Sequence, residues 1–269
     1  MRLDITSFQE AIRAIGADAW VLYDFRGSND LAWTMLSVSP DAHCTRRWMV
    51  VIPAQGHAVK IVHRMEQDPL SHLRLIDKTY ASRQEWEDVV RETLAPYPTL
   101  AMEYSPNNAI PVVSKVDAGT VEHLRSLGHT IVSSGDITQR FVATLDQDQI
   151  AGAAVTGGQV RDAIFLGFKA IRDRILAGGT ISEYEVQQVI MSEFARLDLE
   201  TDTPPIVAIG PNAASPHYAP SMTRTGVIER DMVVVIDAWA KRDVPGAVFG
   251  DLTWVGYTGE SVPSDVART

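Results

Sequence analysis

The longest periodic segment of the sequence follows Asp146 and constrains the fold more than any other feature. Apolar residues recur there at close to the period of an α-helix, up to about Leu176. Asp146 suits the N-cap of such a helix, and Gly178-Gly179 ends it. The sequence therefore predicts one long helix near the middle of the chain. Its apolar positions are Ile150, Val155, Val160, Ile164, Phe168, Ile171 and Ile175.

A second helix and an antiparallel hairpin are expected after the long helix. Ser182 and Glu185 have the spacing of a capping box, which predicts a helix from there to about Leu197. Apolar strand patterns follow, and the last two are separated by a short turn that contains Pro and Gly. The expected strands are residues 206–209, 232–240 and 247–257.

The first part of the chain alternates short apolar runs with amphipathic stretches, as in an α/β domain with a mixed sheet. This change of pattern places a boundary near Leu145. We therefore expect an α/β (α+β) protein with two domains, residues 1–145 and residues 146–269. The predicted helices of the first part are residues 8–15, 84–94 and 116–127, and its predicted strands are residues 19–23, 47–53, 58–63, 99–103 and 130–133.

Composition restricts the functions open to such a chain. Of its 269 residues, 45% are hydrophobic and 22% are charged, the balance of a soluble globular protein with a buried core. A net charge of −10 argues against nucleic-acid binding, and no apolar run is long enough to cross a membrane. The first ten residues lack the apolar stretch of a signal peptide. One cysteine, Cys44, excludes an internal disulfide and a Cys-rich metal site. A cytoplasmic enzyme or binding protein is the expectation that remains.

The strongest candidate for a functional site is the pair Asp237 and Asp251. Asp237 ends an apolar strand, Asp251 lies on the returning strand, and their midpoint is Val244, beside Pro245-Gly246. A reversal centred there places the two carboxylates directly opposite each other, where like charges are destabilising. A divalent cation between them would turn this repulsion into attraction. From the spacing alone, two solvated strand ends are the commoner outcome.

His217 is the second candidate. It follows a strand and a Gly-Pro-Asn turn at residues 210–212, and it stands between Pro216 and Tyr218. A loop histidine beside a carboxylate pair can donate to a reacting oxygen or stabilise a tetrahedral intermediate. A surface histidine without a role is the alternative. The other six histidines lie in the first part of the chain without metal-ligand spacing.

Taken together, these segments resemble a known family. The loop GPNAASPHYAPS (residues 210–221), the strand VVVIDAWA (233–240) and the return FGDLTWVGYTGE (249–260) are similar to the first part of the catalytic domain of the pita-bread metallopeptidases. That family includes aminopeptidase P, prolidase and methionine aminopeptidase, with creatinase as a metal-free relative. Residues 23–30 (YDFRGSND) and 45–48 (TRRW) are similar to the creatinase-type N-terminal domain of its Xaa-Pro members. The resemblance implies such a mixed-sheet domain followed by the first half of a pita-bread domain.

The resemblance also implies a role for each candidate residue. Asp237 matches the first metal-ligand aspartate, Asp251 the bridging aspartate, and His217 the histidine near the substrate carbonyl. The implied cofactors are two divalent metal ions, with Mn favoured and Zn or Co as alternatives, which lower the pKa of water and polarise the peptide carbonyl. The implied substrate is a short peptide with proline in the second position. Two details depart from the family: the aspartates are fourteen positions apart instead of roughly eleven, and the motif DLTWV at residues 251–255 lacks an arginine.

The family completes its metal site with one histidine and two glutamates from later strands, and this sequence lacks them. About 120 residues follow Leu145, and no histidine follows His217. We therefore expect either part of a longer protein that is inactive alone, or a chain that has lost metal chemistry. A metal-free creatinase-like hydrolase and a non-catalytic binding module that reuses the fold remain alternatives.

Two further expectations concern partners. The resemblance implies a homodimer that acts on short peptides, and neither a membrane nor a nucleic acid is an expected partner. Arg26, Arg46 and Arg47 are candidates to reach a substrate. Arginines at the surface or at the edge of the core are commoner, so these three are left out of the predicted site.

Overall fold

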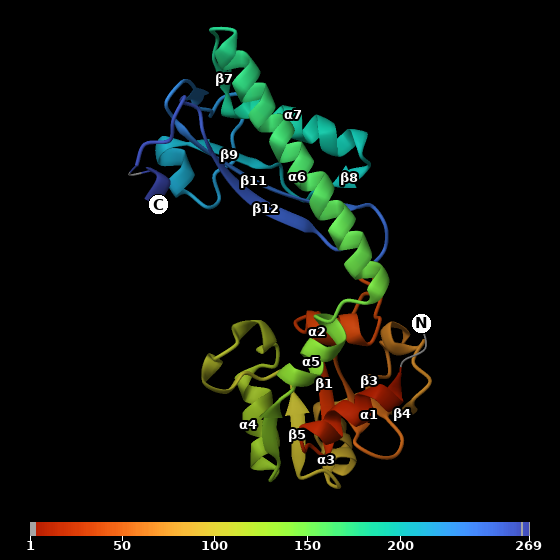
Figure 1. The fold of residues 1–269 in the computed structure, drawn as a ribbon. Coiled ribbons are helices and arrows are strands. Elements are labelled where there is room, and N and C mark those ends of the chain that lie inside the picture. The colour runs from red at the N-terminus through yellow and green to blue at the C-terminus, as the bar shows by residue number, and fades with distance from the viewer. Residues whose placement is uncertain (1–3, 265, 269) are drawn as a thin grey trace. The chain divides into compact units, whose positions relative to one another are not determined.

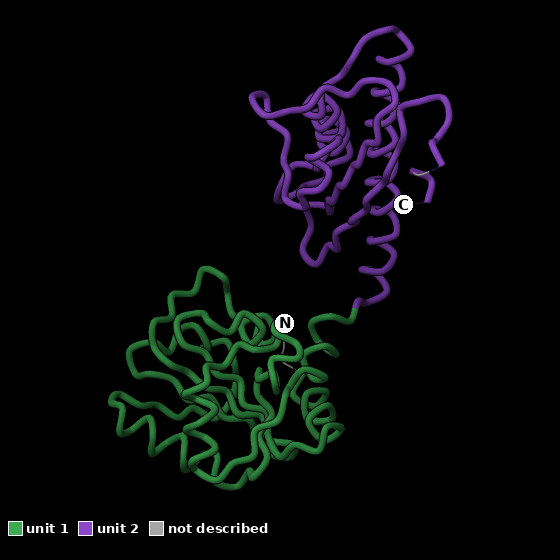
Figure 2. Tube along the Cα trace, turned by 90° about the vertical axis from the view of Figure 1, so that its left-hand side faces the viewer, with its two compact units in different colours: residues 1–144 green, residues 145–269 purple. Residues whose placement is uncertain are grey.

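The computed structural model describes residues 4–264 and 266–268, and the chain divides into two units, Met1–Thr144 and Leu145–Thr269 (Figure 2). The boundary predicted from the sequence lies near Leu145. Each unit has its own hydrophobic core. Throughout the described part of the chain, the helices fall short of the length and apolar character that a membrane span requires.

The first unit is built on a six-stranded mixed sheet (Figure 1). Its strands are β1 (Ala19–Phe25), β2 (Arg47–Pro53), β3 (Val59–His63), β4 (Ile76–Tyr80), β5 (Thr99–Met102) and β6 (Thr130–Ser133). They lie in the order β4-β3-β2-β1-β5-β6. β2 is antiparallel to both β1 and β3, whereas the other neighbouring pairs are parallel. β1 and β2 are buried along nearly their whole length, which explains their continuous apolar runs in the sequence.

Helices cover both faces of this sheet. They are α1 (Ile5–Ala14), α2 (Asp30–Met35), α3 (Arg83–Leu94), α4 (Ala118–Ser126) and α5 (Gly135–Val142), with short 3-10 turns η1 (Asp68–Leu70), η2 (Pro106–Asn108) and η3 (Pro111–Val113). Because side chains of a strand alternate between faces, Trp20 packs in one core layer with α1 and α5, and Val21 packs in the other with α3 and α4. The sequence patterns did not predict α2, α5 and β4.

The second unit packs two helices on one face of a small sheet (Figure 1). The helices are α6 (Gln147–Leu176) and α7 (Glu183–Arg196), and the strands are β7 (Ile181–Ser182), β8 (Leu199–Glu200), β9 (Ile206–Ile209), β10 (Val227–Ile228), β11 (Val233–Arg242) and β12 (Gly250–Tyr257), with 3-10 turns η4 (Gly210–Ala214) and η5 (Val266–Arg268). β11 is the central strand, antiparallel to β12, β9 and β8. β7 and β10 form a separate antiparallel pair.

Both long helices begin where their capping residues predict. The Asp146 carboxylate accepts the N–H of Gln149 at 2.7 Å, and the Gln149 side chain accepts the N–H of Asp146 at 3.0 Å. Ser182 and Glu185 form the same reciprocal pair at the start of α7. Such caps satisfy backbone donors that the first helical turn leaves free, and a cap contributes about 1 kcal/mol.

Alternate residues of β11 fall into a buried and a half-exposed set. The buried set packs under α6 and α7, and consists of Val234, Ile236, Ala238 and Ala240. The half-exposed set lies on the opposite face of the sheet, and consists of Val233, Val235, Asp237 and Trp239. Asp237 therefore lies on the face of the sheet turned away from the two helices.

Candidate metal centre

Asp237 and Asp251 lie on the same face of the β11–β12 hairpin, displaced along it by two positions. Asp237 is paired with Thr253, and Asp251 is paired with Trp239. The predicted placement directly opposite each other is wrong, because the reversal is centred on Pro245, midway between Asp237 and Thr253, instead of on Val244. A shift of one residue in the centre moves the partner by two, which preserves the face. Diagonal neighbours of this kind are roughly 7–8 Å apart, close enough for both carboxylates to reach one cation.

Thr253 holds the carboxylate of Asp237. Its Oγ1 donates to Oδ1 of Asp237 at 2.6 Å, across the pair that the register sets. The side chain of Asp251 is exposed and, among the described residues, has no hydrogen-bond or ion-pair partner. One carboxylate is therefore oriented and the other is free to turn toward a ligand.

His217 lies in an exposed turn that its buried neighbour, Tyr218, keeps in place. Tyr218 is 1% exposed, its hydroxyl donates to Oε2 of Glu183 at 2.5 Å, and its N–H donates to the carbonyl of Ser215 at 3.1 Å. His217 itself is exposed and, within the described residues, makes no hydrogen bond or ion pair. The preceding turn η4 packs against β9 and β11, so the loop that carries His217 leaves from beside the strand of Asp237.

Glu183 is the anchor of this loop, and the sequence analysis missed it. Its side chain is fully buried and accepts hydrogen bonds from the N–H of Ile209 at 2.9 Å, from Nδ2 of Asn212 at 3.0 Å, and from the N–H of Gly226 at 2.5 Å, in addition to Tyr218. These donors replace the water that burial removes. In the sequence, Glu183 is an acidic residue in the first turn of a helix, which is usually a surface position.

Burial, together with the hydrogen bond to Glu183, raises the pKa of Tyr218 to about 12. The phenol therefore stays protonated at neutral pH and remains a donor to the carboxylate. This bond ties the residue next to His217 to the start of α7. The position of the histidine loop consequently depends on a buried carboxyl group, Glu183, that no local sequence pattern identifies.

The donor chemistry of the two aspartates suits part of a metal site. Carboxylate oxygens are the ligands that Mg²⁺, Mn²⁺ and Ca²⁺ prefer. In the part of the chain that the structure describes, no third His, Cys, Asp or Glu joins Asp237 and Asp251 in a group able to hold a metal ion. The residues present therefore fit two positions of a coordination shell.

Residues 149–268 match the model of metallopeptidase family M24. The second unit belongs to this family. A search of curated proteins found no match to the chain. Of the three residues predicted for the site, this M24 unit brings Asp237 and Asp251 onto one face of the sheet. Their role as metal ligands, and that of His217 near the substrate, stay predictions.

Solved structures of M24 enzymes share the fold of both units. The dipeptidase PepE from Mycobacterium ulcerans is 18% identical with a TM-score of 0.63. The match covers 100% of this chain and 69% of the PepE chain. The prolidase from Thermococcus sibiricus is 17% identical with a TM-score of 0.59, and the respective shares are 100% and 68%. The X-prolyl aminopeptidase from Caenorhabditis elegans, described as having a di-nuclear active site, is 15% identical with a TM-score of 0.59, and the shares are 97% and 41%. The predicted fold class, a mixed-sheet α/β domain followed by the first part of a pita-bread domain, is confirmed.

Proposed function

We propose that this chain serves the metal-dependent hydrolysis of the N-terminal peptide bond of short peptides, with proline preferred in the second position. The observation that carries the proposal is the placement of Asp237 and Asp251 on one sheet face, within the segment that matches family M24. The preference for proline is supported by the names of structural relatives, a prolidase and an X-prolyl aminopeptidase. A homodimer, implied by the resemblance, is part of the same proposal.

In this function, each of the candidate residues would have a separate role. Asp237 and Asp251 would hold a divalent ion, with Mn favoured and Zn or Co as alternatives. When bound, such an ion polarises a peptide carbonyl and lowers the pKa of water. Thr253 keeps the carboxylate of Asp237 in one orientation, a type of support whose removal commonly lowers metal affinity 10–100-fold. His217 would donate a hydrogen bond to the charge that develops on the carbonyl oxygen.

Two carboxylate groups supply fewer ligands than a divalent ion such as Mn²⁺ usually binds. Mn²⁺ usually takes about six oxygen ligands, so water would fill most of the remaining positions. We therefore expect weak Mn²⁺ binding by the 269-residue chain and no hydrolysis of Xaa-Pro peptides by this chain alone.

A Mn²⁺ titration tests this site directly. The free Mn²⁺ signal in electron paramagnetic resonance gives the Kd of the full chain and of its Asp237→Asn and Asp251→Asn variants. Each substitution removes one charged ligand, so each should raise the Kd at least about tenfold. Asp243→Asn is the matched control, because Asp243 is an exposed aspartate in the turn of the same hairpin.

Two outcomes would count against the proposed metal site, and a third would count against the expected inactivity of this chain. Equal Mn²⁺ affinity in the wild type and in both site variants would show that the aspartates are not the ligands. A wild-type chain that takes up no Mn²⁺ would favour a metal-free hydrolase or a binding module. Release of alanine from Ala-Pro above background, by purified chain with Mn²⁺, would refute the expected inactivity.

A further inference from the structure

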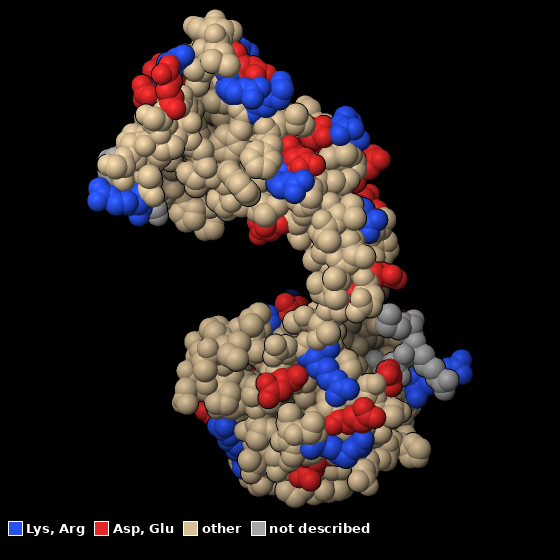
Figure 3. All heavy atoms as spheres, in the orientation of Figure 1, with Lys and Arg blue, Asp and Glu red and all other residues tan. Residues whose placement is uncertain are grey.

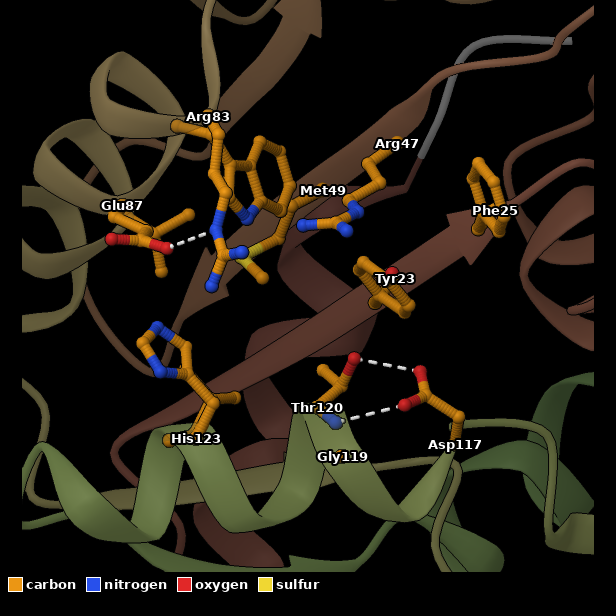
Figure 4. A pocket seen from close by; sticks show the side chains of 13 residues that line it. Tyr23, Phe25, Arg47, Met49, Arg83, Glu87, Asp117, Gly119, Thr120 and His123 are labelled. Carbon is orange, nitrogen blue, oxygen red and sulfur yellow. Dashed lines mark hydrogen bonds and ion pairs between the residues drawn. The ribbon is translucent and has the colours of Figure 1, made fainter.

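Two adjoining cavities lie in the first unit, over the sheet face that α3 and α4 cover. Figure 4 shows the smaller of the two. Their volumes are about 390 and 510 Å³, and they share Phe25, Arg47, Arg83 and Trp86 as lining residues. Arg26 and Arg46 line the larger one. We call the two together the arginine cleft. Its size is that of sites for small organic molecules.

The cleft is rich in positive charge that the protein does not neutralise. Among the described residues, the guanidinium groups of Arg26, Arg46 and Arg47 have no hydrogen bond or ion pair. Figure 4 shows the Arg47 side chain directed into the cavity, toward Tyr23. On a chain whose net charge is −10, three unpaired arginines at one cavity are a marked local reversal of sign.

The acidic side chains at the cleft are already engaged within the protein. Glu87 accepts a hydrogen bond from Nε of Arg83 at 2.8 Å. Asp117 caps α4, where it accepts the N–H of Thr120 at 2.9 Å and the hydroxyl of Thr120 at 2.7 Å. These pairs are drawn in Figure 4. Among the described residues, neither carboxylate forms an ion pair with Arg26, Arg46 or Arg47.

Two carboxylates accept backbone hydrogen bonds from the segments that carry these arginines. The buried carboxylate of Asp24 accepts the N–H of Gly27 at 3.0 Å and of Asn29 at 2.9 Å, which fixes the loop of Arg26. Next to this loop, Glu66 accepts the N–H groups of Thr45 and Arg46, each at 2.8 Å, in the segment that leads into β2 beside the end of β1. The arginines therefore project from backbone that is already organised, which lowers the entropic cost of binding.

Aromatic rings form the wall of the cleft. Trp86 is 5% exposed and packs on Tyr80 and Tyr23, with ring centroids at 4.8 and 6.3 Å, and Phe25 is 44% exposed. Burial raises the pKa of Tyr23 and raises that of Tyr80 to about 12, so neither phenol adds negative charge at neutral pH.

A buried donor or acceptor also remains unused at the cleft. Nε2 of His123, on α4, is buried and has no hydrogen-bond partner among the described residues. In Figure 4 its ring lies on the side of the cavity opposite Arg47. An unpaired buried nitrogen is costly, and a bound ligand would relieve that cost.

We propose that the arginine cleft binds a small organic anion, in which a phosphate or a carboxylate is joined to an aromatic or similarly flat apolar body. Guanidinium groups match both anions with paired hydrogen bonds, and they also stack on flat rings. Phe25 offers most of the apolar surface for the body of the ligand, and the largely buried Trp86 also lines both cavities. This site lies in the first unit and is independent of the function proposed for the M24 unit.

Calorimetric titration of the full chain, in EDTA so that no metal contributes, tests the proposal. Phenyl phosphate and phenylacetate are the two anionic probes, which distinguish the phosphate from the carboxylate. Inorganic phosphate and benzyl alcohol each lack one half of the recognised chemistry. At least one anionic probe should saturate, and both partial probes should bind at least tenfold more weakly than it does.

Single variants locate the binding. Arg47→Ala should raise the Kd of the better probe at least tenfold, and Arg46→Ala gives a second test should the first variant fold poorly. Arg91→Ala is the matched control, because Arg91 lies on α3 outside the cleft and pairs with Asp88. Its Kd should stay within twofold of the wild type.

The proposal would be overturned by any of three results. These are that neither anionic probe saturates, that the cleft variants bind like Arg91→Ala, or that a partial probe binds as tightly as the anion from which it was derived. Circular dichroism of each variant checks that a lost affinity does not come from a lost fold.

Discussion

Glu103 shows how a single buried carboxylate can join distant parts of one unit. It is fully buried and accepts hydrogen bonds from Nε1 of Trp20 at 2.7 Å, from Nδ2 of Asn29 at 2.8 Å and from Oγ of Ser134 at 2.9 Å. The three donors come from β1, from the loop after it and from the residue after β6. Glu103 therefore supports the loop that begins at Arg26 and ends at Asn29.

The charge of Glu103 makes a pH-dependent contribution to stability. Burial raises the pKa of Glu103 above its ordinary value, so the folded state favours the protonated acid. Its contribution is fully present below the unfolded-state pKa of about 4.3 and is lost as pH rises through the raised folded-state pKa. Urea unfolding from pH 4.5 to 7.5 should therefore give a wild-type free energy of unfolding that falls, with rising pH, relative to that of Glu103→Gln. A difference that stays constant or grows with pH would contradict this.

Some of the carboxylates that matter for the candidate site and for the two cores could be found from the sequence, and others could not. Asp237 and Asp251 stand out because each is an isolated charge in an apolar strand pattern. Glu183 and Glu103 do not stand out, because their burial depends on partners 26 to 83 positions away. A carboxylate that is satisfied only by distant donors leaves no local pattern in the sequence.

At the scale of elements, a contact between glycines sets how closely β12 approaches α6. A Cβ built on Gly250 would lie 2.8 Å from the Cα of Gly157, and its other near neighbours are also backbone atoms of α6. Backbone on both sides leaves no flexible side chain to move aside. Gly250 is the residue before Asp251, so the same contact positions one of the candidate ligands.

Substitution of this glycine tests the contact. Gly250→Ala should lower the free energy of unfolding by about 1–3 kcal/mol, the usual cost of overpacking, as measured by urea denaturation. Gly158→Ala is the control, because Gly158 lies in the same helix with no atom within 4 Å of a built Cβ. The control should be neutral or stabilising by up to about 1 kcal/mol. A Gly250→Ala variant as stable as the control would contradict the close approach.

Capping residues and apolar periodicity predicted the long elements. These two signals did not predict the short or exposed elements. α6 and α7 begin at the predicted caps, and the strand predicted at residues 206–209 is β9. β4 was missed because its first four residues are not buried and it shows no alternation. α2 has six residues, too few for a helical period to be visible. The predicted pairing of β11 with β12 is off by two residues, because turn geometry, which fixes the register, is not encoded in the apolar pattern.

At the scale of the whole molecule, acidic residues outnumber basic residues by 34 to 24. Figure 3 shows the two signs interspersed over the charged parts of the face in view, with a broad uncharged area on the second unit. Interspersed charges largely cancel at short range, whereas the net charge of −10 acts at longer range. A divalent cation is therefore drawn to the chain as a whole before it meets Asp237 and Asp251.

This long-range attraction makes the proposed metal binding dependent on salt. The screening length falls from roughly 20 Å at 20 mM salt to about 4–5 Å at 500 mM, which removes the contribution of distant charges but leaves that of the two ligands. Raising KCl over this range should increase the Kd for Mn²⁺ several-fold, measured by the free Mn²⁺ resonance signal at constant pH. The Asp243→Asn control should show nearly the same salt dependence, because it removes one charge from the net value and no ligand. A Kd unchanged by salt would mean that ligands near the ion supply the whole affinity, which two carboxylates on an open sheet face are not expected to do.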